Sequence, residues 1–154
     1  MNAVTTRHQA FRALLAALAM PGSRHPIPGP EPLALILDSL YADVEIALQC
    51  GAIIIAASQL TPETIERAPR GTELEPETAA TLFLQADEQT RWEPVVLQGP
   101  GIQSPMRTKV PLSRASLEAR ARACNSFPLG IDIVAVDHDA NVLALPRTTR
   151  VELV

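Results

Sequence analysis

Four consecutive residues near the carboxyl end, Arg147, Thr148, Thr149 and Arg150, have the side chains best suited to binding an anion. Arginine presents a planar fork of N–H donors that matches a phosphate group, and two neighbouring hydroxyls can complete the shell of donors. The same residues suit a structural corner, in which Arg147 pairs with a carboxylate such as Asp132 and the threonines bond to turn backbone. Residue chemistry alone favours the structural corner and keeps anion binding as the alternative.

Two other motifs begin like known binding loops and then depart from them. Residues 99–101 (Gly-Pro-Gly) follow an expected strand, as a dinucleotide-binding loop does, but the third glycine of that motif is missing. Asp137, Asp139 and Asn141 have the spacing of the first calcium ligands, yet the twelfth position of the loop is Thr148 rather than glutamate. We therefore expect a plain turn at the first motif and a water-exposed hairpin tip at the second.

The single lysine, Lys109, raises the question of a Schiff base with pyridoxal phosphate. Residues 108–111 (Thr-Lys-Val-Pro) supply the lysine without a phosphate cup of glycine, serine and arginine. Cys124 closes an expected helix, where the helix dipole opposes a thiolate, and none of the three histidines has a second ligand at zinc spacing. The sequence predicts neither a cofactor nor a metal, and a stand-alone pyridoxal enzyme using Lys109 is the weaker alternative.

The composition limits the class of protein. The 154 residues suit one domain over residues 1–154, and a net charge of −4 argues against nonspecific nucleic-acid binding. Aromatic residues make up only 3% of the chain, so the core must consist of Ala, Leu, Ile and Val, which favours helices laid closely on a sheet. Two isolated cysteines indicate a reducing, cytoplasmic compartment, and the apolar run at residues 13–20 is too short to span a membrane.

Hydrophobic periodicity and capping residues predict the elements that would position these side chains. Helices are expected from Thr6 to about Met20, over residues 33–40, after Thr61, and from Ser113 to about Cys124. In the first of them, Phe11, Leu14, Leu15 and Leu18 should form the buried face. Strands are expected over residues 44–48, 53–57, 80–85, 95–97, 131–136 and 142–145. This mixture predicts a single α/β domain with a mixed β-sheet flanked by helices.

Residues 127–132 (Phe-Pro-Leu-Gly-Ile-Asp) and 143–149 (Leu-Ala-Leu-Pro-Arg-Thr-Thr) closely resemble the PhnH family. Less specific similarity extends over residues 95–102, 71–82, 11–15 and 20–22, so the resemblance covers most of the chain. The chain departs from the family between the second expected helix and Gly71, where family members are usually longer. There residues 49–52 (Gln-Cys-Gly-Ala) stand in place of a His-Thr-Gly-Ala-type segment.

The resemblance implies a subunit of the bacterial carbon–phosphorus lyase system, which breaks down phosphonates. It also implies a fold like the large domain of pyridoxal-phosphate-dependent transferases without the cofactor, a homodimer, and assembly with PhnG, PhnI and PhnJ subunits. That complex transfers the phosphonate to the ribose 5-triphosphate of ATP and releases adenine. No catalytic residue carries over, so we expect a noncatalytic structural subunit. The alternative is a subunit that binds nucleotide or phosphonate through Arg147, Thr148 and Thr149.

Overall fold

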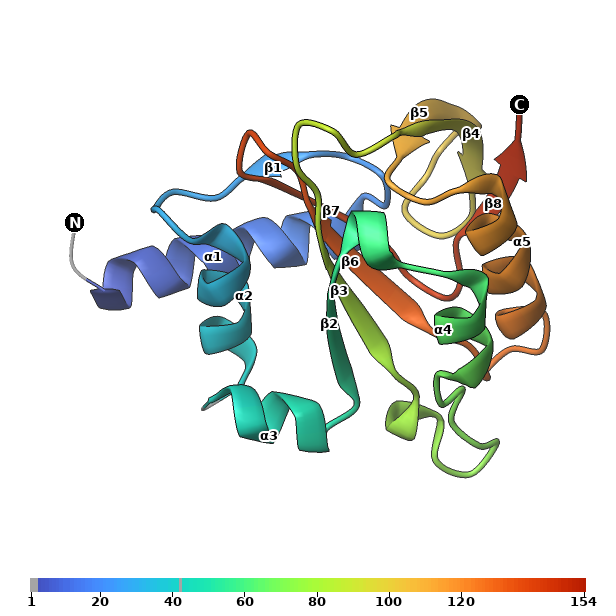
Figure 1. The fold of residues 1–154 in the computed structure, drawn as a ribbon, viewed down its shortest axis with the longest axis horizontal. Helices are drawn as coiled ribbons and strands as arrows, with labels where there is room; N and C mark the ends of the chain where they lie inside the picture. The colour runs from blue at the N-terminus through green and yellow to red at the C-terminus, as the bar shows by residue number, and fades with distance from the viewer. Residues whose placement is uncertain (1–2, 42) are drawn as a thin grey trace.

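The computed structural model describes residues 3–41 and 43–154, and of residues 3 and 4 only the backbone. Figure 1 shows helices on both sides of a central sheet, with a smaller sheet beside it. The helices are α1 (Ala3–Ala19), α2 (Pro32–Leu40), α3 (Val44–Gln49), α4 (Pro62–Arg67) and α5 (Arg114–Ala123). The strands are β1 (His25–Pro26), β2 (Ala52–Ala56), β3 (Thr81–Gln85), β4 (Glu93–Gln98), β5 (Met106–Val110), β6 (Asp132–Val136), β7 (Asn141–Leu145) and β8 (Arg150–Leu153).

The central sheet has five strands in the order β1-β7-β6-β3-β2. Strands β2, β3 and β6 are parallel, and β7 and β1 continue the sheet in antiparallel pairing. Almost every side chain of β6 and β7 is buried, because helices or the second sheet cover both faces. The structure thus confirms the predicted α/β class with a mixed sheet.

A second sheet of three antiparallel strands, β5-β4-β8, was only partly predicted from the sequence. Its central strand β4 was expected, whereas β5 and β8 were not. Strand β5 alternates exposed and half-buried residues and β8 does the same, so neither has the apolar run that marks a buried strand. Strand β8 is nevertheless important, because it joins the terminal segment to the second sheet.

The core lies on both faces of the central sheet, in two separate clusters. Successive residues of β3 point to opposite faces, so Leu82 and Leu84 pack toward α4 and α5 while Phe83 packs toward α1 and α2. The second sheet lies on the α4–α5 side, where Val95 and Leu97 join the larger cluster. Both clusters consist largely of Ala, Leu, Ile and Val, as the composition predicts.

The predicted strand over residues 44–48 is wrong, because these residues form helix α3. Val44, Ile46 and Leu48 alternate with other residues, which favours a strand when one face is buried. In the structure all three side chains are exposed, and only Ala47 of this helix is buried. The Asp43 carboxylate accepts a hydrogen bond of 2.8 Å from the Ile46 amide, which caps the helix at its N-terminus.

Helix α1 buries a different face from the one predicted. It begins before Thr6, so the capping box expected there is wrong. Of the four residues expected to be buried, only Leu14 is; Phe11, Leu15 and Leu18 are exposed. The face that packs on the sheet consists instead of Leu14 and three alanines, namely Ala10, Ala13 and Ala17. Small side chains allow the helix to lie close to β7, which agrees with the expectation from the composition.

Two other predicted caps are confirmed. The Thr61 hydroxyl accepts a hydrogen bond of 3.3 Å from the Thr64 amide at the start of α4. The Ser113 hydroxyl accepts one of 3.1 Å from the Ser116 amide at the start of α5. Both caps supply an acceptor to an amide that has no partner within its helix, and they fix where each helix begins.

Candidate anion-binding site at the β7–β8 corner

The predicted corner connects the two sheets. Strand β7 ends at Leu145 in the central sheet, and β8 begins at Arg150 in the second sheet. Between them the Thr149 amide donates a hydrogen bond of 2.9 Å to the Pro146 carbonyl, which closes a tight turn. Pairing of Ile133 with Leu145 brings the start of β6, where Asp132 lies, beside this turn.

Arg147 is held by Asp132, as the structural interpretation of the sequence predicts. Its backbone amide donates a hydrogen bond of 2.7 Å to Asp132 Oδ1, and its guanidinium donates to both carboxylate oxygens, from Nε at 3.3 Å and from Nη2 at 2.9 Å. Nη1 donates to the carbonyls of Pro76 and Pro128, each at 3.0 Å. The hydrogen bonds to Asp132 raise the pKa of Arg147 above its ordinary value.

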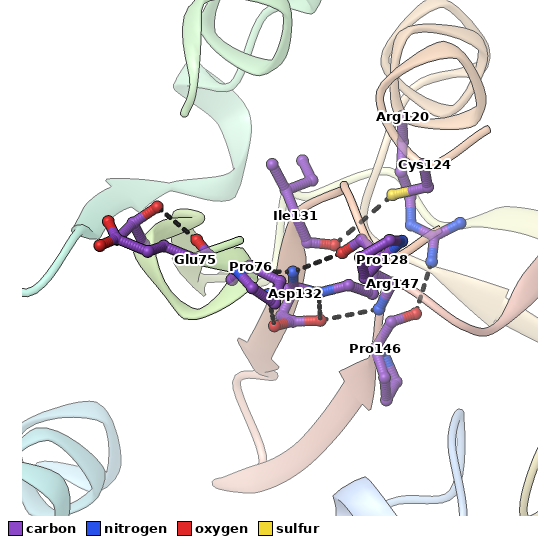
Figure 2. Close-up of polar contacts among 10 residues, drawn as sticks. Glu75, Pro76, Arg120, Cys124, Pro128, Ile131, Asp132, Pro146 and Arg147 are labelled. Carbon is purple, nitrogen blue, oxygen red and sulfur yellow. Dashed lines mark hydrogen bonds and ion pairs between the residues drawn. The ribbon is translucent and has the colours of Figure 1, made fainter. Parts of the chain in front are cut away.

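This set of bonds uses most of the donors of Arg147. Figure 2 shows its guanidinium directed toward Asp132 and Pro128. Three segments distant in sequence therefore meet at one side chain: the loop before β3, the loop before β6 and the corner itself. Arg147 stabilises the packing of these segments, and its contribution to ligand binding stays a prediction.

The other three residues of the predicted motif differ in their surroundings. Thr149 is buried, and its hydroxyl oxygen has no hydrogen-bond partner. Thr148 and Arg150 are exposed, and Arg150 makes an ion pair of 3.4 Å with Glu152 on the surface of β8. The structure therefore brings one buried hydroxyl, one exposed hydroxyl and one exposed guanidinium to the same corner.

Arg120 of α5 also reaches the corner, and the interpretation of the sequence did not include it in the candidate site. Its Nη2 donates a hydrogen bond of 2.8 Å to the carbonyl of Pro146 (Figure 2). The same nitrogen donates one of 3.0 Å to the carbonyl of Thr149. The side chain is 2% exposed, and burial lowers its pKa from the ordinary value. The signal in the sequence is that Arg120 lies three residues after Leu117, on the buried side of α5, whereas Arg114 and Arg122 project into solvent.

A surface cavity of about 380 Å³ lies between α5 and this corner. It is lined by Arg120, Ala121, Cys124, Asn125, Arg147, Thr148, Thr149, Arg150 and Val151. These residues include three arginines, and none of them is acidic. The cavity can therefore accept an anion chemically, even though the chain as a whole has a net charge of −4.

The hairpin tip between β6 and β7 is only partly exposed, which corrects the expectation from the sequence. Asp137 is buried, and its Oδ1 accepts hydrogen bonds of 2.9 Å from the amides of both Asp139 and Asn141. The Asp137 carboxylate thus stabilises the hairpin turn by accepting backbone N–H groups, as in an Asx turn, and is not exposed to solvent. Only His138 and Asp139 are exposed, and they contact each other at 3.4 Å.

The turn at residues 99–101 and Lys109, the two other candidates from the sequence, lie in surroundings that do not suggest a binding site. Residues 99–101 form the turn after β4, as predicted, and a Cβ added at Gly101 would clash with the carbonyl of Ala19. Lys109 is exposed on β5, where it pairs opposite Pro94. A Schiff-base lysine needs a buried setting that lowers its pKa, so the surroundings of Lys109 do not fit a bound pyridoxal phosphate.

Within residues 3–41 and 43–154, no group of three or more His, Cys, Asp or Glu side chains is placed to hold a metal ion. In the same residues, no helix has the length and apolar character needed to cross a membrane.

Comparison with known proteins identifies the family. The search of curated proteins gave no match. Residues 39–152 match the family model described as bacterial phosphonate metabolism protein (PhnH), and this segment includes the whole corner and its cavity. Because the match extends over more than half of the 154 residues, it shows membership and not merely a shared motif. The chain therefore belongs to the PhnH family of bacterial phosphonate metabolism proteins.

Proposed function

We propose that the protein is a noncatalytic subunit of the carbon–phosphorus lyase core complex, in which it forms a homodimer and assembles with PhnG, PhnI and PhnJ subunits in the cytoplasm. The complex transfers an alkylphosphonate to the ribose 5-triphosphate of ATP and releases adenine. The observation that carries the proposal is the family match, which links the chain to phosphonate metabolism. We further propose that the mixed sheet corresponds to the large domain of pyridoxal-phosphate-dependent transferases, without the cofactor.

The exposed apolar face of α1 supports a role as a subunit. Phe11, Leu15 and Leu18 follow one another along one side of this helix, and Met20 at its end is also exposed. Monomeric proteins rarely leave such contiguous apolar surface in water, because covering it stabilises the protein. A partner subunit that covers this face would bury these side chains.

Co-purification tests this proposal. Tagged protein is expressed with PhnG, PhnI and PhnJ, and the assembly is analysed for all four subunits and for adenine release from ATP in the presence of an alkylphosphonate. Leu15→Glu, which places a charge on the α1 face, should weaken assembly. Leu74→Glu is the matched control, because Leu74 is 93% exposed in a loop away from α1. Failure of the wild-type chain to assemble with these subunits would contradict the proposal.

A second candidate function is that the subunit binds nucleotide or phosphonate directly and contributes Arg147, Thr148 and Thr149 to the transfer reaction. The cavity at the corner supports this candidate, because its lining is rich in arginine and contains no carboxylate. Mutation distinguishes the two functions. A Thr148→Val variant that assembles normally but is slow in adenine release would favour direct binding, whereas unchanged release would favour the purely structural role.

A further inference from the structure

We infer that the cavity between α5 and the β7–β8 corner binds a tetrahedral phosphorus oxyanion, a phosphate or phosphonate group, and that Arg120 and Thr149 form the centre of the site with Arg150 at its rim. This inference rests on the second candidate function and moves the centre of binding from Arg147 to Arg120.

The first argument is the balance of charge. Of the three guanidiniums at the corner, those of Arg120 and Arg147 are the less exposed, and the negative charge of Asp132 acts on both. Asp132 is hydrogen-bonded to Arg147. Arg120 instead donates to two neutral carbonyls, although it stays protonated at neutral pH. Among the described residues Arg120 therefore has no carboxylate hydrogen-bonded to it, which is costly for a buried charge, and a bound anion would supply that partner.

The second argument is the presence of unpartnered polar atoms. Five buried side-chain nitrogen or oxygen atoms in the described part of the chain have no hydrogen-bond partner, and two of them, Arg120 Nε and Thr149 Oγ1, belong to residues that line this cavity. Such atoms are rare in folded proteins because each loses its bonds to water without replacement. Both residues line the same cavity, and the several oxygens of one oxyanion bound there would offer acceptors to the N–H of Arg120 and the O–H of Thr149.

The third argument is the character of the rim. Arg150 and Thr148 are exposed at the mouth of the cavity, and the side chain of Arg150 is 73% exposed with only a surface ion pair to Glu152. Such a pair contributes little energy, so Arg150 is free to turn toward an incoming anion. The volume of about 380 Å³ is ample for one phosphorus oxyanion and is at the small end of the range for ligand sites.

Calorimetric titration of the isolated full-length protein tests the inference. Inorganic phosphate and methylphosphonate are titrated at constant ionic strength, with chloride as the reference anion. We expect saturable binding of one anion per chain. Thr149→Val should weaken binding about 10-fold or more through loss of one hydrogen bond to a charged oxygen. Arg120→Lys should also weaken it about 10-fold or more, because lysine lacks the planar fork. ATP is added as a competitor to show whether a nucleotide's phosphate or a phosphonate is preferred.

Two variants keep the test decisive. Thr149→Val removes a hydroxyl that makes no hydrogen bond in the structure, so this variant should fold even if Arg120→Lys does not. Arg122→Ala is the matched control on the same helix, because Arg122 is exposed and pairs with Glu66. Absence of saturable binding to the wild-type chain overturns the inference, and so does binding that Thr149→Val leaves unchanged or that Arg122→Ala weakens equally.

The anion-binding experiment and the assembly experiment can fail independently of each other. Phosphate binding is measured on the isolated chain, and assembly is measured with PhnG, PhnI and PhnJ. If binding is present and assembly fails, the anion site stands and the proposed complex is wrong. If assembly occurs and the isolated chain binds neither anion, the proposed complex stands and the anion site is wrong.

Discussion

Replacement of Arg147 by alanine should destabilise the protein well before it affects any ligand. The guanidinium makes four hydrogen bonds, two to Asp132 and one each to the carbonyls of Pro76 and Pro128. Arg147→Ala removes all four and leaves the Asp132 carboxylate with only the backbone amide of residue 147. The carboxylate and the Pro128 carbonyl must then find water in a partly buried corner, whereas the Pro76 carbonyl keeps its hydrogen bond of 3.2 Å from the Ala79 amide.

The expected loss follows from the burial of the pair. Breaking a fully buried ion pair by removing one partner costs about 3–5 kcal/mol. The Arg147 and Asp132 side chains are 16% and 27% exposed, so water recovers part of that cost and we expect a loss of about 3 kcal/mol. In a protein of this size each kcal/mol lowers Tm by about 2–4 °C, which predicts a fall of roughly 6–12 °C.

Thermal and urea unfolding measure this loss, and Arg150→Ala is the matched control. Arg150 is an arginine of the same corner, but its exposed side chain makes one surface ion pair, so its replacement should cost about 0.5 kcal/mol or less. A double-mutant cycle of Arg147→Ala with Asp132→Ala should give a coupling energy of about 1–3 kcal/mol. If Arg147→Ala is no more destabilising than Arg150→Ala, or if the coupling energy is near zero, the reasoning that the corner is held by this pair is refuted.

Two further predictions concern other parts of the fold. Burial, and secondarily the charge of Cys50, raise the pKa of the only tyrosine, Tyr41, above 10.0, so ultraviolet titration should detect the tyrosinate at higher pH in the folded than in the urea-unfolded chain. Because folding favours the neutral phenol of Tyr41, this contribution to stability is complete below pH 10.0 and is lost as the pH rises through the pKa of the folded chain. Equal titration midpoints in the folded and unfolded chains would contradict the prediction. Cys50→Ser should reduce the difference between the two midpoints only in part. Asp137→Ala removes the acceptor for two backbone amides and should lower the free energy of unfolding, measured by urea denaturation, by about 2 kcal/mol. Asp139→Ala, at an exposed position, should change the free energy of unfolding by less than about 0.5 kcal/mol. Similar losses in the two variants would argue against the buried cap.

Much of the fold could be predicted from the sequence, because many of its signals act within a few residues. The caps at Thr61 and Ser113 each need one side-chain oxygen and an amide three positions on, and both are present in the structure. The buried strands β6 and β7 follow from two runs of apolar residues, mostly β-branched in β6, that are joined by a tight turn. The pairing of Arg147 with Asp132 was also predicted, since the hairpin brings the two ends together.

Other features depended on which surfaces meet in three dimensions. Residues 44–48 alternate like a strand, yet they form a helix whose larger apolar side chains, Val44, Ile46 and Leu48, are exposed. In α1 three of the larger apolar residues, Phe11, Leu15 and Leu18, are exposed, because the face made by Leu14 and the alanines allows closer packing on β7. The sequence periodicity is the same whichever face is covered, so it could not decide between them.

The candidate site shows the same division. The sequence by itself determined the residue types of the corner, including the arginines and threonines that suit an anion. The sequence favoured pairing of Arg147 with Asp132 and kept anion binding as the alternative, and the tertiary structure shows the pairing. Only the tertiary structure decided that Arg120, from a helix more than twenty residues earlier, lies buried at the same cavity. The reason is physical: donor chemistry belongs to each side chain, whereas a free donor is defined by the groups that folding brings within hydrogen-bonding distance.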